Sequence, residues 1–210
     1  MTRHTHRLNI AACLIALLAC RGTAALAAPE TFDFKDPKGV NNAVFKLDAP
    51  LEAVTGNATG ISGKVSFDPA EPGTTTGKIV VASTSMHVGN PMQLEHLRSD
   101  KWMDVAKYPE ISFETKELKN VKTSGDTTTA DVIGTFTCKG IAKDITVPVK
   151  FTYLKDKLSK RVPNMNGDLL VIRADFSIKR SDFGIMPGQM EEKVSDAIEL
   201  TLSIAGASPR

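Results

Sequence analysis

The stretch "TADVIGTFTCKGIAKDITVPVKFTYL" (residues 129–154) decides the fold class. Apolar and polar residues alternate through 129–138 and again through 144–154, and the turn-forming residues "CKGIAKD" (138–144) join the two runs. A period of two is typical of a β-strand that buries one face, and a connection this short favours antiparallel neighbours. Pro148 lies inside the second run and predicts a sheet edge or a bulge there, because proline has no N–H to donate to a neighbouring strand.

The same alternation recurs along the rest of the chain. Together with the two runs above, it predicts a set of about eight strands, the others being residues 42–47, 61–68, 78–86, 110–118, 169–178 and 197–206. The only helix-like stretch is 91–105, in which Leu94, Leu97 and Met103 are expected to face inward. Many strands with one apolar face and little helix leave two all-β architectures, a sandwich and a closed barrel, and the alternation fits both.

The first 27 residues have the features of a bacterial secretory signal. Two arginines precede an apolar run (8–20) that is too short to span a bilayer comfortably, and Ala25-Leu26-Ala27 fits an A-x-A cleavage site. We therefore expect residues 1–27 to be removed and residues 28–210 to form one exported domain. The alternative is a lipoprotein, because "LLAC" (17–20) resembles a lipobox, and lipidation of Cys20 would keep the protein near a membrane. Either route takes the chain out of the cytosol and predicts a periplasmic protein.

Charge and cysteine content exclude several classes of protein. Without residues 1–27, the 26 Lys and Arg of the chain become 23 against 24 Asp and Glu, a formal charge of −1, so nothing attracts nucleic acid. Cys138 is then the only cysteine, so no internal disulfide forms and packing must supply the stability. We interpret Cys138 as a small apolar strand residue beside Phe136.

Sequence motifs give no support for catalysis or for a metal or other cofactor. His87 and His96 are the only histidines after processing, and neither belongs to a metal-binding pattern. Asp182-Phe183-Gly184 matches one short motif of protein kinases, but the glycine-rich loop, the strand lysine and the catalytic loop of kinases are missing. We therefore expect no enzyme activity, no cofactor and no metal site.

Five segments, in order, resemble the YceI-like family of periplasmic proteins. They are "GKVSFDP" (63–69), "LEHLRSDKWMDVAKYPEISFET" (94–115), "GTFTCKGIAKDITVPVKF" (134–151), "IKRSDFGI" (178–185) and "VSDAIELTLSIAGA" (194–207). The resemblance implies a single antiparallel lipocalin-like β-barrel of about eight strands with a short helical insert, which binds polyisoprenoids. The chain departs from the family pattern in two places: residues 38–50 lack a His-Ser pair, and Lys139 stands where the family often has histidine.

The apolar faces of the strands are expected to point into one shared interior, where some residues contact ligand and others pack the closed end. The cavity candidates are Val65, Phe67, Val81, Phe113, Val132, Phe136, Val149, Phe151, Ile172 and Phe176. The candidates at the rim, where a head group would lie, are Arg98, Trp102, Arg180 and Asp182. Arg180 and Asp182 would share a strand face. We expect Arg180 to hold the strand end to the helical insert through Asp100 or a neighbouring acid; alternatively, Arg180 or Arg98 contacts a head group.

The predicted function is an exported carrier for an isoprenoid-type amphiphile of the quinone or polyprenyl phosphate class. Each buried methylene contributes ~0.8 kcal/mol, so several isoprene units outweigh the cost of immobilising the ligand. One alternative is a hydrolase-like envelope enzyme at the barrel mouth, which would need a cavity with convergent polar residues. The other is a ligand-free interaction module, which would need an interior filled by large side chains. The oligomeric state is not readable from the sequence.

Overall fold

The computed structural model describes residues 29–210. The predicted signal segment, with Cys20 and the lipobox-like residues 17–20, lies outside these described residues. Within residues 29–210, eleven strands form one sheet. They are β1 (Glu30–Asp33), β2 (Asn42–Asp48), β3 (Ala53–Ala58), β4 (Ile61–Phe67), β5 (Thr76–Ala82), β6 (Met86–Val88), β7 (Glu110–Ser124), β8 (Thr127–Cys138), β9 (Ile141–Leu154), β10 (Gly167–Lys179) and β11 (Ala197–Pro209).

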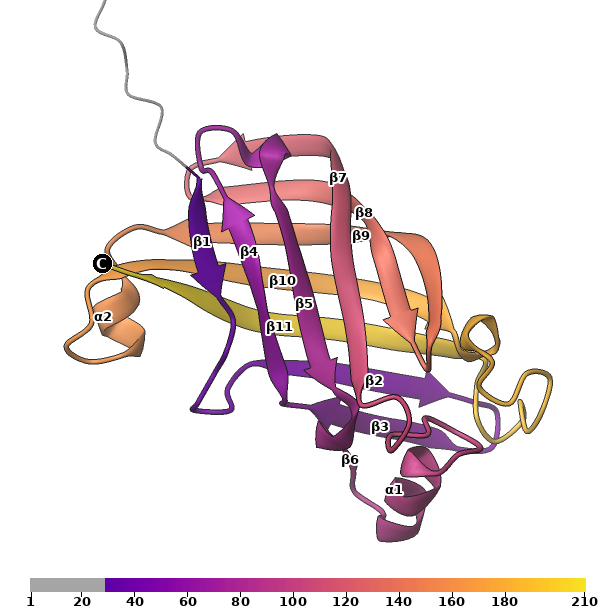
Figure 1. The fold of residues 1–210 in the computed structure, drawn as a ribbon. Coiled ribbons are helices and arrows are strands. Elements are labelled where there is room, and N and C mark those ends of the chain that lie inside the picture. The colour runs from indigo at the N-terminus through magenta and orange to yellow at the C-terminus, as the bar shows by residue number, and fades with distance from the viewer. Residues whose placement is uncertain (1–28) are drawn as a thin grey trace, which may run out of the picture.

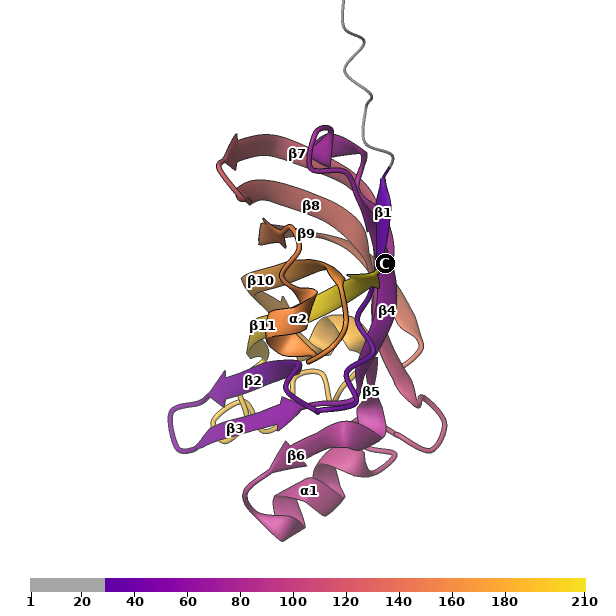
Figure 2. The same ribbon diagram turned by 90° about the vertical axis from the view of Figure 1, so that its left-hand side faces the viewer.

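Eight of these strands close into an antiparallel barrel (Figure 1). The order is β1-β4-β5-β7-β8-β9-β10-β11, and the pairing of Asp33 with Ala207 joins β1 to β11 and completes the circle. The predicted barrel is confirmed, and the sandwich is not formed. The remaining strands β2, β3 and β6 continue the sheet from β11, and Figure 2 shows them at the end of the barrel that carries the helix α1 (Pro91–Arg98).

The hairpin of residues 129–154 forms as predicted. Cys138 pairs with Ile141, and the two intervening residues, Lys139 and Gly140, both have positive φ (47° and 76°), as in the tight turns that suit twisted strand pairs. Pro148 pairs with Asp131 of β8, whereas the ladder between β9 and β10 begins only at Val149. Pro148 therefore marks the point where β9 becomes an edge toward β10, which confirms the edge expectation.

One predicted strand is wrong in its extent. The run 78–86 was expected to be continuous, but the chain leaves β5 at Ala82, makes a 3₁₀ turn over Ser83–Ser85 and starts β6 at Met86. The Ser83 N–H donates to the carbonyl of Pro109 and its hydroxyl donates to the carbonyl of Tyr108. These bonds fix the buried serine against the entry of β7, so the strand bends and its second half pairs with β3 instead.

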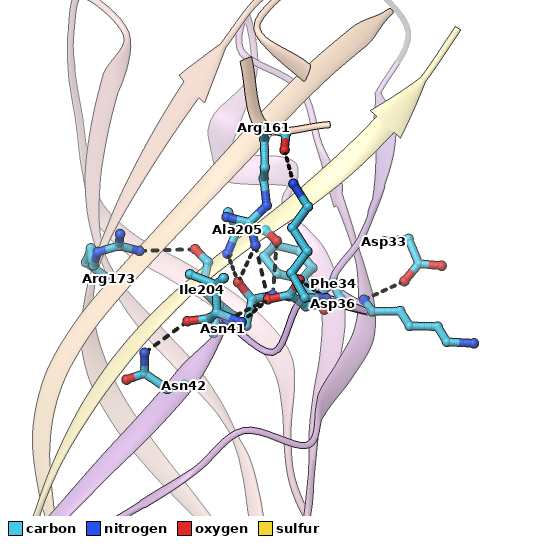
Figure 3. Close-up of polar contacts among 12 residues, drawn as sticks. Asp33, Phe34, Asp36, Asn41, Asn42, Arg161, Arg173, Ile204 and Ala205 are labelled. Atoms are coloured by element: carbon cyan, nitrogen blue, oxygen red, sulfur yellow. Dashed lines mark hydrogen bonds and ion pairs between the residues drawn. The ribbon is translucent and has the colours of Figure 1, made fainter. Parts of the chain in front are cut away.

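Both β1 and β2 pair with the same edge of strand β11, and a side chain fills the gap between these two strands (Figure 3). β2 pairs with β11 up to Ser203 and β1 pairs at Ala207, which leaves the backbone of Ala205 without a strand partner on this edge. The buried side chain of Asn41 accepts from the Ala205 N–H (2.9 Å) and donates to its carbonyl (3.1 Å). The amide thus replaces a strand residue, since a buried peptide group without partners is costly.

The loop that carries Asn41 is itself fixed by a carboxylate (Figure 3). Asp36 accepts hydrogen bonds from the backbone N–H groups of Lys38, Val40 and Asn41, and it lies 3.2 Å from Nη2 of Arg161. Arg161 ends the short helix α2 (Leu158–Arg161), so this ion pair ties the loop to the helix at one end of the barrel. Among residues 29–210, no helix has the length and apolar character needed to cross a bilayer.

The interior divides into a packed end and a mouth. At the packed end, the rings of Phe67 and Phe151 stack with centroids 5.7 Å apart, and Phe32 and Leu170 are fully buried. A second apolar cluster surrounds the mouth and includes Phe45, Met86, Met103, Phe136, Phe183 and Ile185. The barrel is therefore closed at one end by aromatic packing.

Candidate functional site

A cavity of about 970 Å³ occupies the half of the barrel away from the packed end. Nine of the ten predicted cavity residues line it: Val65, Val81, Phe113, Val132, Phe136, Val149, Phe151, Ile172 and Phe176. The tenth, Phe67, does not reach the cavity, because its ring stacks on Phe151 and closes the floor. A ligand role for these residues remains a prediction, but their shared interior is a feature of the structure.

The cavity also has walls made by residues outside the ten predicted ones. These extra side chains come from β2, β3, β6 and β11 and include Phe45, Leu47, Val54, Met86, Val88, Ile198, Leu200 and Leu202. Of these strands, β2, β3 and β6 extend the sheet beyond the closed barrel and lengthen the cavity toward the mouth. Alternation in 42–47 and 197–206 marks the apolar faces of β2 and β11. Only the pairing with β11 brings the apolar face of β2 to the cavity.

Two glycines make room for aromatic rings on the cavity wall. A Cβ on Gly134 would lie 2.5 Å from the Phe113 ring, and one on Gly56 would lie 2.2 Å from the Phe45 ring. Real Cβ contacts are longer than this, so each ring occupies space that a side chain at the glycine would need. These rings keep the wall apolar while leaving the centre of the barrel open.

The helical insert lies at the mouth and is shorter than expected. The side chain of Asn90 caps α1 by accepting from the N–H groups of Met92 (2.9 Å) and Gln93 (3.2 Å), and the helix ends at Arg98 instead of continuing to residue 105. Met103 is buried as predicted, and Leu94 and Leu97 are partly buried against the mouth cluster. The insert therefore covers one side of the opening.

Cations fix the insert to the barrel through backbone carbonyls. Nη2 of Arg98 donates to the carbonyls of Thr84 (2.9 Å) and Met86 (3.2 Å). From the turn between β8 and β9, Nζ of Lys139 donates to the carbonyls of Asp100 (3.1 Å) and Lys101 (3.2 Å). Arg98 was a head-group candidate, but it does not line the cavity and holds the insert in place instead.

Arg180 is fully buried and lines the cavity, and its partners differ from those predicted. The segment Arg180–Phe183 is a 3₁₀ turn, not a strand, so Arg180 and Asp182 do not share a strand face. The expected bond to Asp100 is also wrong. The guanidinium has five N–H groups, and each donates a hydrogen bond to a different carbonyl of the loop that follows. The acceptors are the carbonyls of Ile185, Met186, Gln189, Val194 and Ser195.

This arrangement makes Arg180 the centre of a loop at the mouth, and it leaves no donor for a head group. We call residues 184–196 the mouth loop. Trp102, the only tryptophan, lines the cavity with its ring centroid 5.9 Å from Cζ of Arg180, so the insert and the mouth loop meet there. Asp182 points elsewhere and forms an exposed ion pair with Lys143 (2.7 Å).

The buried thiol of Cys138 near the cavity has little reactive character. Burial raises the pKa of the Cys138 thiol to about 12, so the thiolate is scarce at neutral pH and the interpretation as an apolar residue fits. His96 lines the mouth and His87 lies in β6. In the part of the chain that the structure describes, no group of three or more His, Cys, Asp or Glu side chains is placed to hold a metal ion.

Comparison with known proteins agrees with this architecture. The YceI-like domain profile matches residues 37–205. A UPF0312 protein of Pseudomonas paraeruginosa is 28% identical over 152 residues, which is 72% of each chain, and one of Yersinia pestis is 28% identical over 151 residues. The crystal structure of Burkholderia cenocepacia BcnA is similar with a TM-score of 0.62, at 23% identity over 78% of this chain and 95% of that one.

A fourth relative has a ligand class in its description. It is a polyisoprenoid binding domain from Saccharophagus degradans, implicated in plant cell wall breakdown, with a TM-score of 0.61 at 13% identity over 86% of this chain and 99% of that one. At such low identity, the likeness shows the shared fold. Because the family profile covers most of the chain and the barrel agrees with it, this protein belongs to the YceI-like domain family.

Proposed function

We propose that this protein is an exported carrier that holds the apolar tail of an isoprenoid-type amphiphile inside its barrel. The observation that carries the proposal is the apolar cavity of about 970 Å³, closed at one end and open at the other, in a member of the YceI-like family. The polyisoprenoid-binding relative from Saccharophagus degradans supports the ligand class. The open interior argues against a ligand-free module, and the apolar walls favour binding over catalysis.

The volume limits the length of the tail. If a methylene needs the ~30 Å³ that a water molecule takes in the liquid, the cavity holds about 30 carbon atoms, or about six isoprene units. Four units would contribute roughly 12 to 16 kcal/mol at ~0.8 kcal/mol per methylene, against a cost on the order of 10 kcal/mol for immobilisation. Tail burial alone is therefore enough for binding.

Head-group contacts are left to residues at the mouth. Arg180 has no free donor, so of the four rim candidates we expect Trp102, which lines the cavity, to touch a ligand. Gln93, Lys101 and Lys193 also line the mouth and offer donors to a quinone carbonyl or a phosphate. This supports a carrier that tolerates either class of head group.

Export is part of the proposal and is supported by the sequence of residues 1–27. Cleavage after Ala27 would release the domain into the periplasm, whereas lipidation of Cys20 would tether it to a membrane. N-terminal sequencing of the protein from its own envelope fraction separates the two routes, and a retained Met1 would contradict both.

The tunnel can be tested with a matched pair of substitutions. Val132→Trp adds bulk inside the cavity, while Ile133→Trp places the same tryptophan side chain on the opposite face of β8. Val132→Trp is expected to stay folded, at about 1 to 3 kcal/mol of overpacking, and to lose affinity for long prenyl tails more than for short ones. Titration of each variant with prenyl alcohols of increasing length, followed by Trp102 fluorescence in the parent and by native mass spectrometry in all forms, measures this. Equal losses for short and long tails, or no binding by the parent, would contradict the proposal.

A further inference from the structure

The cavity mouth carries exposed apolar side chains on three separate elements. Leu51 lies in the β2–β3 turn and is 65% exposed, Met92 lies in the first turn of α1 and is 66% exposed, and Met190 lies in the mouth loop and is 50% exposed. Figure 1 shows the β2–β3 turn, α1 and the mouth loop at the same end of the barrel. We call Leu51, Met92 and Met190 the apolar rim.

The apolar rim is continuous with the cavity. Met92 and Met190 are part of the cavity lining as well as exposed, so they lie where the apolar interior meets solvent. Leu51 does not line the cavity, but the next residue, Glu52, does. The N–H of Leu51 donates to the carbonyl of Glu192 in the mouth loop (2.9 Å). The three side chains therefore surround one opening and are not scattered singly over the surface.

The geometry points to a lipid bilayer as the partner of this rim: we propose that the apolar rim inserts into the membrane interface, so that a prenyl tail passes between bilayer and cavity without crossing water. This inference rests on the proposed function. Each methylene of a tail exposed during transfer would cost ~0.8 kcal/mol, so a mouth that opens directly into the acyl region removes the main barrier to loading.

The size of the rim argues against a protein partner. A stable protein interface buries about 800 Å² per partner. Three side chains, each smaller than an aromatic one that buries at most about 250 Å², do not reach this area even if they are fully buried. Single apolar side chains on separate turns are instead suited to entering the acyl boundary of a bilayer.

Charge at the mouth indicates which force drives docking. Arg180 also lines the cavity but is buried, and the exposed charged residues of the lining are two acids, Glu52 and Asp100, and two bases, Lys101 and Lys193, so these charges balance at the opening. A surface without net charge gains little from anionic lipids. We therefore expect docking on neutral phosphatidylcholine vesicles with weak dependence on salt.

The chain offers a matched control for the rim. Leu51 and Val40 are both exposed residues in connections between strands, and Val40 is 58% exposed. Val40 belongs to the loop fixed by Asp36, which lies beside α2 and not at the mouth. Neither residue lines the cavity, so Leu51→Asp and Val40→Asp place the same charge at the two ends of the molecule.

The experiment uses Trp102 as a reporter of mouth orientation. The parent and both variants, all with the same N-terminus, are mixed with phosphatidylcholine vesicles whose acyl chains carry bromine, which quenches tryptophan on contact. Quenching in the parent and in Val40→Asp, with about tenfold weaker partition of Leu51→Asp, is the expected result, because a half-buried leucine is lost and a carboxylate must be desolvated. An unquenched parent, or equal quenching of Leu51→Asp and Val40→Asp, would overturn the docking proposal.

A second measurement separates this inference from the proposed function. The rate of uptake of a fluorescent prenyl lipid should rise in proportion to vesicle concentration if the mouth collides with the bilayer, and a rate independent of vesicle concentration would contradict docking. Leu51→Asp should keep the parent's affinity for the same lipid supplied in detergent, while its uptake from vesicles falls about tenfold. If the parent binds no prenyl lipid from detergent, the proposed function fails, and the quenching result still decides whether the rim docks.

Discussion

Replacing Arg180 tests the idea that one buried guanidinium organises the mouth loop. The side chain is 0% exposed, and each of its five N–H groups donates to a different carbonyl between Ile185 and Ser195. Arg180→Met keeps much of the volume and removes every donor. Hydrogen bonds to a charged group contribute about 1.5 to 3 kcal/mol each, but the loop is near the surface and water can reach several of the freed carbonyls.

The expected cost of Arg180→Met is therefore about 3 to 5 kcal/mol, as for other buried charged networks that lose one partner. For a domain of this size, this corresponds to a melting temperature lower by about 6 to 20 °C. Arg180→Lys can replace at most three of the five bonds and is expected to be intermediate. The free energy of unfolding from urea titration measures both.

Arg173→Met is the matched control. Arg173 is exposed on β10, and it too donates to backbone carbonyls, those of Ile172 (3.0 Å) and Ile204 (3.2 Å). Figure 3 shows the bond to Ile204. Because solvent can take over those carbonyls, its loss should stay within about 0.5 kcal/mol of the parent. If Arg180→Met were no less stable than Arg173→Met, the carbonyl network would not hold the loop and the reasoning would be refuted.

Three further predictions concern other parts of the molecule. Asn41→Leu should lower the free energy of unfolding in urea by about 2 to 4 kcal/mol, because it leaves the backbone of Ala205 on the β11 edge unpaired. Asn42→Leu removes one exposed hydrogen bond and should cost little. Similar losses in the two variants would contradict the role of Asn41 in closing the gap between β1 and β2. Cys138, with a pKa of about 12, should react with a soluble disulfide at pH 8 about a thousandfold more slowly than an exposed cysteine, and fast labelling of the native protein would contradict its burial. Burial raises the pKa of Asp196, but hydrogen bonds from Ser181 and the charge of Arg180 outweigh burial and lower this pKa overall. The ionised Asp196 therefore stabilises the folded protein above the ordinary pKa of about 3.9, and this stabilisation is lost as the pH falls through the lower folded pKa. Asp196→Asn should flatten the loss of melting temperature below about pH 4, and an unchanged pH profile would contradict that role.

The sequence predicted the walls of the barrel better than its closure. Alternation through 129–154 and the turn at Lys139-Gly140 are local signals, so the central hairpin was readable. The pairing of Asp33 with Ala207 joins opposite ends of the domain, and β1 is only four residues long, too short for a period of two to stand out. The break at Ser83–Ser85 was also hidden, because its residues are Ser-Thr-Ser and no glycine or proline marks the turn.

At the site, side-chain type was predictable and partners were not. Nine apolar residues reached the shared interior because strand period alone assigns their face. The partners of Arg180 are backbone carbonyls, which every residue possesses, so no pattern of side chains could single them out. An acid such as Asp100 was the visible candidate for an arginine, and the loop geometry that excludes it is set by tertiary structure.

The two ends of the barrel are held by different chemistry, and the difference matters for a carrier. At the packed end, stacked aromatic rings and a side-chain amide that completes the sheet leave nothing to rearrange without opening strands. At the mouth, the insert and the mouth loop are fixed by cations on carbonyls, through Arg98, Lys139 and Arg180. Such contacts reach from a strand or helix end to a loop, so a loop can shift without disturbing a β-ladder. Opening is then confined to the end where a tail would enter, while the packed end keeps the barrel intact.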